Sequence, residues 1–371
     1  MPYGTINADV IQSSVSGVSL GAGNASIMKN RIINGAMVID QRNAGASSTP
    51  SSNTYLVDRW SYVSSQASKF TWGQNLNSVT PPAGFKNYLG GQVASAVSVG
   101  STDYFQLFQP IEGYNVADLG FGTANAKTVT LSFWVYSSLT GTFGGSLNNA
   151  DTSRNYPYTY SIPVANAWTQ ISVTISGDTT GTWNTTNGAG LYVRFGLGVG
   201  STYSGTAGSW SSTLYVSATG ATSVVGTNGA TFYITGVQLE VGSSATGFEY
   251  VNYQTSLANC QRYYYRIKAS AANSIFGSGY ASDTTNARQF VPFPTIMRIA
   301  PTAIETTGTA GDYRITHAAG NTACNAVPVF NSADTFSAFA STSVASGLTT
   351  GQGNVLGSVN SSAYLGWSAE L

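Results

Sequence analysis

Short stretches in which apolar and polar residues alternate run through most of this chain. The clearest are residues 128–136, 168–176 and 190–199, where nearly every second residue is apolar. A period of two puts one face of a β-strand against a core and turns the other face away from it. Such stretches recur between turns rich in Gly, Ser and Asn, which predicts an all-β fold.

The spacing of these stretches divides the chain into an arm and two modules. Residues 1–30 carry only isolated apolar positions and bury too little to fold alone, so a disordered tail and an arm ordered on a partner both fit them. About eight to ten strands over residues 31–252 predict a jelly-roll β-sandwich. Residues 253–371 hold shorter strands with Pro at their edges, which predicts a smaller C-terminal β-sandwich.

The segment from 232 to 266 marks the seam between the modules. It begins as a strand in which Phe232 and Ile234 alternate with polar residues, with a register change predicted near Gly236. The pattern breaks at residues 242–244 and continues through a short connector into three consecutive tyrosines at 263–265. At the other end of the sandwich, Asn34-Gly35 predicts a strand–turn–strand opening over residues 29–45.

The composition narrows the choice of partners. Only 8% of the residues are charged, against about 25% in an average soluble protein. The 15 basic and 15 acidic residues cancel, and the chain is 12% aromatic and 42% hydrophobic, which is not a disordered composition. A neutral, charge-poor surface tolerates self-association. It argues against nucleic acid, which requires a concentrated basic surface.

Two cysteines, Cys260 and Cys324, in a chain of this length predict free thiols rather than a disulfide framework. The N-terminus lacks a basic and an apolar signal region, and no apolar run reaches the roughly 18 residues of a membrane span. We therefore expect no membrane insertion, and synthesis in a cytoplasm followed by assembly.

Little in the sequence indicates catalysis. The lone histidine, His317, excludes a cluster of histidine ligands, and no GxSxG elbow accompanies it. The carboxylates are scattered singly; Asp103, Glu112 and Asp118 are predicted in turns and caps, and Glu240 on the surface or an edge. We expect no enzyme, no cofactor and no bound metal, although a carboxylate pair that forms only on folding would leave no mark in the sequence.

Aromatic residues carry the clearest binding hypothesis. Trp72, Trp183 and Trp210 stand in polar contexts rich in Gly, Ser and Thr, where an indole ring can stack on the apolar face of a sugar. The alternative is that each covers an end of the sandwich or lies in an oligomer interface. Two sets of aromatic residues are assigned to packing: Tyr156, Tyr158 and Tyr160 to an interface, and Trp60, Trp134, Trp168 and Trp367 to the core or a sheet face.

Several short motifs carry a family resemblance. The "QLE-G" strand that leads into "CQRYY", the opening "NGAM-IDQR" with "VDRW", and the ending "AYLGWSAEL" resemble segments of tailed-bacteriophage structural proteins of the tail-fibre type. The strands "AW-QISVTISGD" and "GVQLEVG" resemble those of carbohydrate-binding-module jelly rolls.

The resemblance implies a non-catalytic virion protein, a tail fibre or receptor-binding appendage that attaches to a glycan of the host surface. It implies a homotrimer attached to other virion proteins through the N-terminal arm, with the C-terminal module as a distal knob. Two alternatives remain open: a capsid-decorating or head-fibre protein with a purely structural role, and a polysaccharide-degrading tailspike.

Overall fold

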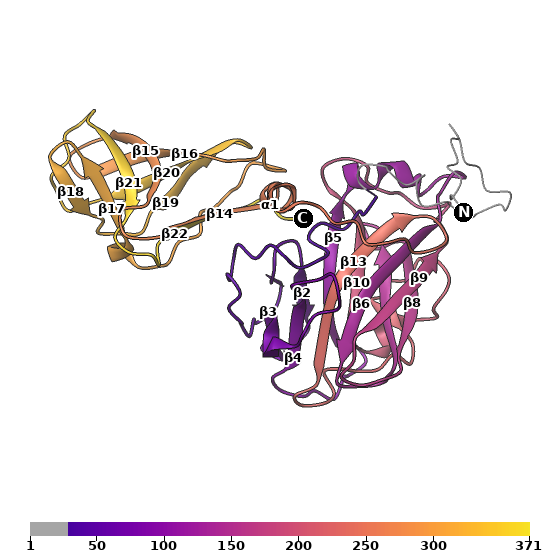
Figure 1. The fold of residues 1–371 in the computed structure, drawn as a ribbon. Helices are drawn as coiled ribbons and strands as arrows, with labels where there is room; N and C mark the ends of the chain where they lie inside the picture. The colour runs from indigo at the N-terminus through magenta and orange to yellow at the C-terminus, as the bar shows by residue number, and fades with distance from the viewer. Residues whose placement is uncertain (1–28) are drawn as a thin grey trace, which may run out of the picture.

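The computed structural model describes residues 29–371, so nearly all of the predicted N-terminal arm lies outside the described residues. Figure 1 shows two β modules, with one short α-helix between them. Most regular elements of the described chain are strands, which confirms the all-β prediction.

The first module is a jelly-roll sandwich of two antiparallel sheets. The six-stranded sheet has the order β1 (Thr54–Tyr55), β2 (Ser61–Ser64), β5 (Tyr104–Glu112), β10 (Ala189–Val199), β7 (Gly141–Asn148) and β8 (Asn155–Ile162). The five-stranded sheet has the order β3 (Phe70–Gln74), β4 (Leu89–Val93), β13 (Thr231–Val241), β6 (Val129–Ser137) and β9 (Thr169–Ile175).

The core of this module lies between the two sheets and follows the predicted alternation. On β6, Leu131 and Phe133 are buried in it, whereas Trp134 and Tyr136 lie half-buried on the outer face. The ring of Phe133 packs edge-on against Phe195 of the opposite sheet, with centroids 5.1 Å apart. Burial of each of these two side chains contributes about 1.5–3 kcal/mol to the stability of the fold.

The hydrophobic pattern of the sequence did not predict β7, a strand in the interior of the six-stranded sheet. Its glycines break the alternation, yet the sheet requires them: a Cβ at Gly145 would collide with the carbonyl oxygen of Arg194 on the neighbouring strand. Glycine in a strand interior marks such a close approach. Gly145 therefore interrupts the alternating pattern of the sequence and also allows β7 to lie close to β10.

The opening segment differs from the prediction. Residues 29–45 form turns rather than a strand–turn–strand unit, and Arg31 N donates to Leu239 O at 2.9 Å beside β13. The predicted register change is confirmed: β13 carries a bulge between Thr235 and Gln238, and Gly236 there has a φ of 61°.

The second module contains a seven-stranded and a two-stranded antiparallel sheet. The larger has the order β18 (Gly320–Ala323), β17 (Tyr313–His317), β21 (Gly353–Ser358), β15 (Ile275–Ala281), β16 (Asn286–Pro292), β20 (Ser337–Ser343) and β19 (Val329–Ala333). The smaller pairs β14 (Tyr264–Lys268) with β22 (Tyr364–Ser368). The core of the second module is separate from that of the jelly roll and includes the fully buried Trp367. The boundary at residues 252 and 253 stays a prediction.

The connector contains a helix that the hydrophobic pattern did not predict. The helix α1 (Tyr253–Gln261) is capped by Asn252, whose side chain accepts a hydrogen bond from Thr255 N. Asn is a preferred N-cap, so this signal was present in the sequence. The remaining short elements are η2 (Leu76–Ser78), η3 (Gly113–Asn115), η4 (Ala117–Leu119), η5 (Ser201–Tyr203), η6 (Ala310–Asp312), β11 (Ser204–Gly205) and β12 (Ser217–Ala218).

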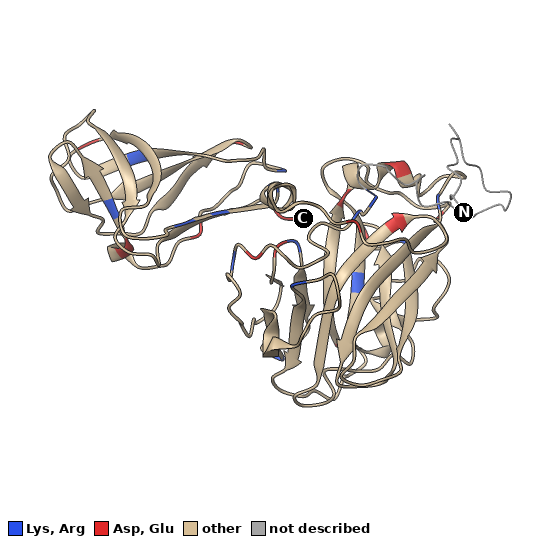
Figure 2. Ribbon diagram, viewed as in Figure 1, with Lys and Arg blue, Asp and Glu red and all other residues tan. Residues whose placement is uncertain are grey.

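Charged residues gather where the two modules meet, as the blue and red segments of Figure 2 show. Arg262 holds the buried carboxylate of Glu112 with two hydrogen bonds, 2.8 and 2.6 Å long. Near the C-terminus, Glu370 pairs with Arg42 and Arg59 of the first module. The guanidinium of Arg59 also lies 3.6 Å from the ring centroid of Tyr263. The tyrosine-rich seam is therefore a polar, arginine-lined contact.

Candidate functional site

The outer face of the six-stranded sheet carries a cluster of polar and aromatic side chains around one arginine. In the strand register Arg194 of β10 lies opposite Phe108 of β5 on one side and Ser146 of β7 on the other. One step along the same face, Tyr192 of β10 lies opposite Asn148 of β7. Because side chains alternate along a strand, these residues point away from the core that Val193 and Phe195 face.

Arg194 is fixed in this face by two amide side chains. Its Nε donates to Asn148 Oδ1 at 2.7 Å, and its Nη1 donates to Gln106 Oε1 at 2.8 Å. The guanidinium lies 4.7 Å from the ring centroid of Tyr192 and 5.1 Å from that of Phe108. Contacts on this scale are cation–π interactions, which strengthen when the cation is shielded from water.

The charge of Arg194 has no acidic partner among residues 29–371, although the residue is only 9% exposed. Burial lowers the pKa of Arg194 to about 10, so it stays a cation at neutral pH. The other buried arginine of the described chain, Arg59, pairs with Glu370. The remaining nitrogen of Arg194, Nη2, has no partner among the described residues and is not enclosed.

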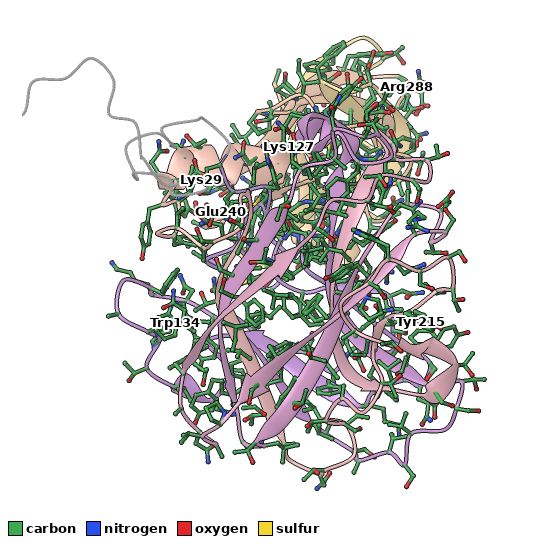
Figure 3. The ribbon with its side chains drawn as sticks, turned by 90° about the vertical axis from the view of Figure 1, so that its right-hand side faces the viewer. Lys29, Lys127, Trp134, Tyr215, Glu240 and Arg288 are labelled. Carbon is green, nitrogen blue, oxygen red and sulfur yellow. The ribbon has the colours of Figure 1, made fainter. Side chains whose placement is uncertain are left out.

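An arch formed by residues 200–221 borders this face. Its β11 and β12 pair with each other, and Tyr215 O accepts a hydrogen bond from Asn148 Nδ2 at 3.0 Å. Tyr203 of the arch packs edge-on against Tyr104 of β5, with centroids 5.6 Å apart. In Figure 3, Tyr215 projects on the side of the sandwich opposite to Trp134. We call Tyr104, Gln106, Phe108, Asn148, Tyr192, Arg194 and Tyr203 the arginine face.

Three tryptophans were predicted from the sequence to bind a sugar, and for Trp72 that prediction is wrong. Its side chain is 1% exposed and packs between Tyr62 and Phe70, with centroids 5.4 and 5.5 Å away. A buried ring offers no face to a sugar. The prediction failed because Trp72 is on the edge strand β3, not in a turn, and its ring is part of the core.

Trp183 and Trp210 are brought together at one end of the sandwich, where both are half-buried. Their centroids are 5.5 Å apart, and both rings also contact Phe121. Their indole nitrogens donate to Thr180 O at 3.1 Å and to Ser176 O at 2.8 Å. The cluster covers the core at this end, as the alternative hypothesis expected. A role in sugar binding stays a prediction for this pair.

Several other side chains lie in a different environment from the one predicted. Tyr156, Tyr158 and Tyr160 share a face, as predicted, but this face is the core, and their exposure is 7, 1 and 6%. They form no interface, because the opposite sheet already covers them. Glu240 is fully buried rather than on the surface or an edge; its carboxylate accepts hydrogen bonds from Gln238 Nε2 and Thr246 N, both 2.8 Å long.

The four remaining tryptophans pack as predicted. Trp60 and Trp367 are fully buried, one in each core. Trp168 is half-buried over the outer face of the five-stranded sheet, where its ring contacts Tyr88 and Tyr136 at 5.5 Å. Trp134 is half-buried on that face.

A cleft of about 460 Å³ lies near the seam. Residues 30–38, the connector and α1 line it. Its charged groups are already satisfied within the protein: Arg262 pairs with Glu112, and Glu249 accepts a hydrogen bond from Asn30 N at 2.6 Å. Arg31 also lines the cleft and pairs with Asp118, although its Nε has no partner among the described residues. The arginines that line the cleft therefore both have an acidic partner, unlike Arg194.

The groups considered for chemistry are structural or isolated. Asp103 accepts hydrogen bonds from the turn at Gly100, as predicted, and Asp118 pairs with Arg31, whereas Glu112 holds the module junction. His317 contacts Thr322. Within residues 29–371 no three His, Cys, Asp or Glu side chains are grouped for a metal ion, and no helix has the length and apolarity to cross a membrane. Both cysteines are buried and free.

No protein-family model matches the chain, and no curated protein matches it. Among solved structures, the enzymatically active domain of tailspike protein 4 of bacteriophage CBA120 is similar over 57% of this chain and 21% of that one, with 13% identity and a TM-score of 0.32. This chain therefore spans about a fifth of the tailspike chain.

Two carbohydrate-binding modules are similar over more of their own length. A family 11 module from a cellulosomal cellulase of Clostridium thermocellum covers 55% of this chain and 98% of its own, with 11% identity and a TM-score of 0.28. The module TmCBM61 in complex with β-1,4-galactotriose is similar over 57% of this chain and 98% of its own, with 9% identity and a TM-score of 0.29. TM-scores of this size establish neither a shared ligand nor a shared activity.

Proposed function

We propose that this chain is a non-catalytic, glycan-binding structural protein of a tailed-bacteriophage particle, a tail fibre or receptor-binding appendage. The observation that carries the binding part is the arginine face. It places half-exposed aromatic rings beside amide side chains and a guanidinium on the outer face of a rigid sheet. The sequence resemblance to tail-fibre proteins supports the location in a virion.

The chemistry of the face suits a sugar. A pyranose ring has an apolar C–H face that stacks on the rings of Phe108 and Tyr192, which lie 5.8 Å apart. Its hydroxyls are donors and acceptors, for which Gln106 supplies an amide group, whereas the buried Asn148 holds Arg194 in place. Ligand sites combine apolar and aromatic surface with a few fixed polar groups, and strands hold such groups more firmly than loops.

Binding is tested by titrating the protein with surface polysaccharides of candidate hosts and measuring heat or tyrosine and tryptophan fluorescence. Tyr192→Ala should weaken binding at least about tenfold, because an aromatic anchor at an interface contributes about 2 kcal/mol or more. Tyr253→Ala is the matched control, since Tyr253 is 60% exposed on α1, away from the six-stranded sheet. Equal binding by the two variants would overturn the proposed site.

The homotrimer is part of the same proposal. The outer side of the seven-stranded sheet exposes Phe290 and Phe339, which are paired in register with centroids 5.6 Å apart and are 38 and 37% exposed. Tyr280 and Val329 are exposed on nearby strands. A second copy of the chain would cover this apolar surface. A monomer by light scattering at physiological salt would contradict the trimer, and particle labelling in the electron microscope tests whether the chain is in the tail or on the capsid.

A further inference from the structure

We propose that the arginine face selects sugars that carry a carboxylate, such as uronic acids, and that Arg194 binds the carboxylate through its free Nη2. This inference rests on the proposed glycan binding and narrows the class of ligand. It follows from one feature of the described chain: a buried guanidinium on a face of a sheet, with hydrogen-bond partners but no counter-charge.

A buried cation without an anion is costly, because desolvation of the charge is not repaid by an ion pair. The two amides that hold Arg194 are neutral, so they orient the guanidinium without cancelling its charge. The other buried arginine among residues 29–371, Arg59, pairs with Glu370. Arg288, Arg298 and Arg314 also lack an acidic partner among these residues, but each is at least partly exposed to water. Arg194 is therefore the buried arginine of the described chain that has no counter-charge.

The geometry also limits what the missing partner can be. Asn148 and Gln106 occupy Nε and Nη1, which leaves the two N–H donors of Nη2 toward the accessible side of the face. Charge-assisted hydrogen bonds from arginine to carboxylate are shorter and stronger than neutral ones. Phe108 and Tyr192 flank the guanidinium, so an acidic sugar could place its carboxylate at Nη2 and its ring on an aromatic side chain.

If the role of Arg194 were purely structural, its guanidinium would only donate hydrogen bonds to the amide groups of Asn148 and Gln106. In that case the positive charge would be incidental, and the preference of the face for acidic over neutral sugars would be absent. The two explanations therefore differ in a property that stability measurements do not report: the effect of the ligand's own carboxylate on binding.

The experiment compares a panel of uronic-acid-containing bacterial capsular polysaccharides in two forms: native, and after chemical reduction of the carboxyls to alcohols. Wild-type protein should bind the native form of at least one polysaccharide roughly 10- to 100-fold more tightly than its reduced form, the range of a charge-assisted hydrogen bond. Arg194→Met should bring the affinities for the native and the reduced form to within about twofold of each other, whatever the variant does to the affinity for the reduced form.

The controls separate the possible failures. Lys86→Met removes one positive charge from an exposed loop of the same module and should keep the preference. Arg194→Lys keeps the charge but not the planar fork, so the preference should weaken without vanishing; a circular dichroism melt confirms that each variant is folded.

Equal binding of both forms by wild type, with no change in Arg194→Met, would overturn the carboxylate inference and leave glycan binding intact. A preference that survives in a folded Arg194→Met variant would likewise overturn it. No binding of any panel member, native or reduced, would overturn both proposals.

Discussion

Glu112 is the buried carboxylate at the junction of the two modules, and replacing it with glutamine should weaken their association. The side chain is 1% exposed and accepts hydrogen bonds from Arg262 Nε, Arg262 Nη2 and Tyr263 Oη. Glutamine keeps the shape but replaces one acceptor oxygen with an amide that faces these donors. The variant also removes the charge that balances Arg262.

The expected cost lies between two limits. Breaking a fully buried ion pair costs about 3–5 kcal/mol, whereas exposed pairs contribute about 0–1 kcal/mol. Because Glu112 is buried and the Arg262 side chain is 32% exposed, we expect a loss of about 2–3 kcal/mol in the free energy of unfolding. If the whole chain unfolds as one unit, that corresponds to roughly 3–4 °C in the melting temperature.

Differential scanning calorimetry measures this loss and shows whether the modules unfold together or in two steps. Asp118→Asn is the matched control, because it breaks the pair between Arg31 and Asp118, whose side chain is 49% exposed; its expected cost is below about 1 kcal/mol. If Glu112→Gln destabilises the protein no more than this control, the account of the junction is refuted.

The ion pair between Glu112 and Arg262 should also make the stability of the protein depend on pH. Burial alone would raise the pKa of Glu112, but hydrogen bonds from Arg262 and Tyr263 outweigh it and lower the pKa from 4.5. A lowered folded-state pKa means that the stabilisation is fully present above the unfolded value and is lost as pH falls through the folded value. The stability difference between wild type and Glu112→Gln should therefore be largest near neutral pH and shrink in acid.

The remaining predictions concern the core. Trp72→Ala should cost about 3–5 kcal/mol in a urea titration, and a loss below about 1 kcal/mol would contradict its burial. Gly236→Ala should lower the urea midpoint, because the φ of 61° is strained for alanine and a Cβ would lie 2.6 Å from the ring of Phe85; an unchanged midpoint would count against the bulge. Cys260 and Cys324 should react with a thiol reagent only after unfolding, since burial raises the pKa of both thiols. Labelling of both thiols in the native protein would disprove that placement.

Much of the fold could be predicted because alternation is a local property. The strand at residues 128–136 shows its buried and outer faces within nine residues, and β6 (Val129–Ser137) has both as predicted. The pattern fails where another strand decides what fits. On β7, Gly145 is required by the carbonyl of Arg194, which is 49 positions away in the sequence.

The candidate site shows the same limit. Trp72 and Trp210 have similar polar neighbours in the sequence, yet the first is in the core and the second covers an end of the sandwich. The arginine face was missed, although a single charge in the outward position of the strand at 190–199 was visible. Among residues 29–371, Arg194 is the buried arginine that has no acidic partner in space, and spatial partners cannot be read from a pattern of period two.

The sequence by itself determined the class of fold, the alternating faces of the long strands, the bulge at Gly236 and a charge-poor composition, because each depends on neighbouring residues or on totals. Only the tertiary structure decided which aromatic rings are buried, that Glu112 and Glu370 bind arginines across the junction, and that no acidic side chain of residues 29–371 pairs with Arg194. These properties depend on which strands become neighbours, and strand pairing brings together residues that are far apart in the chain.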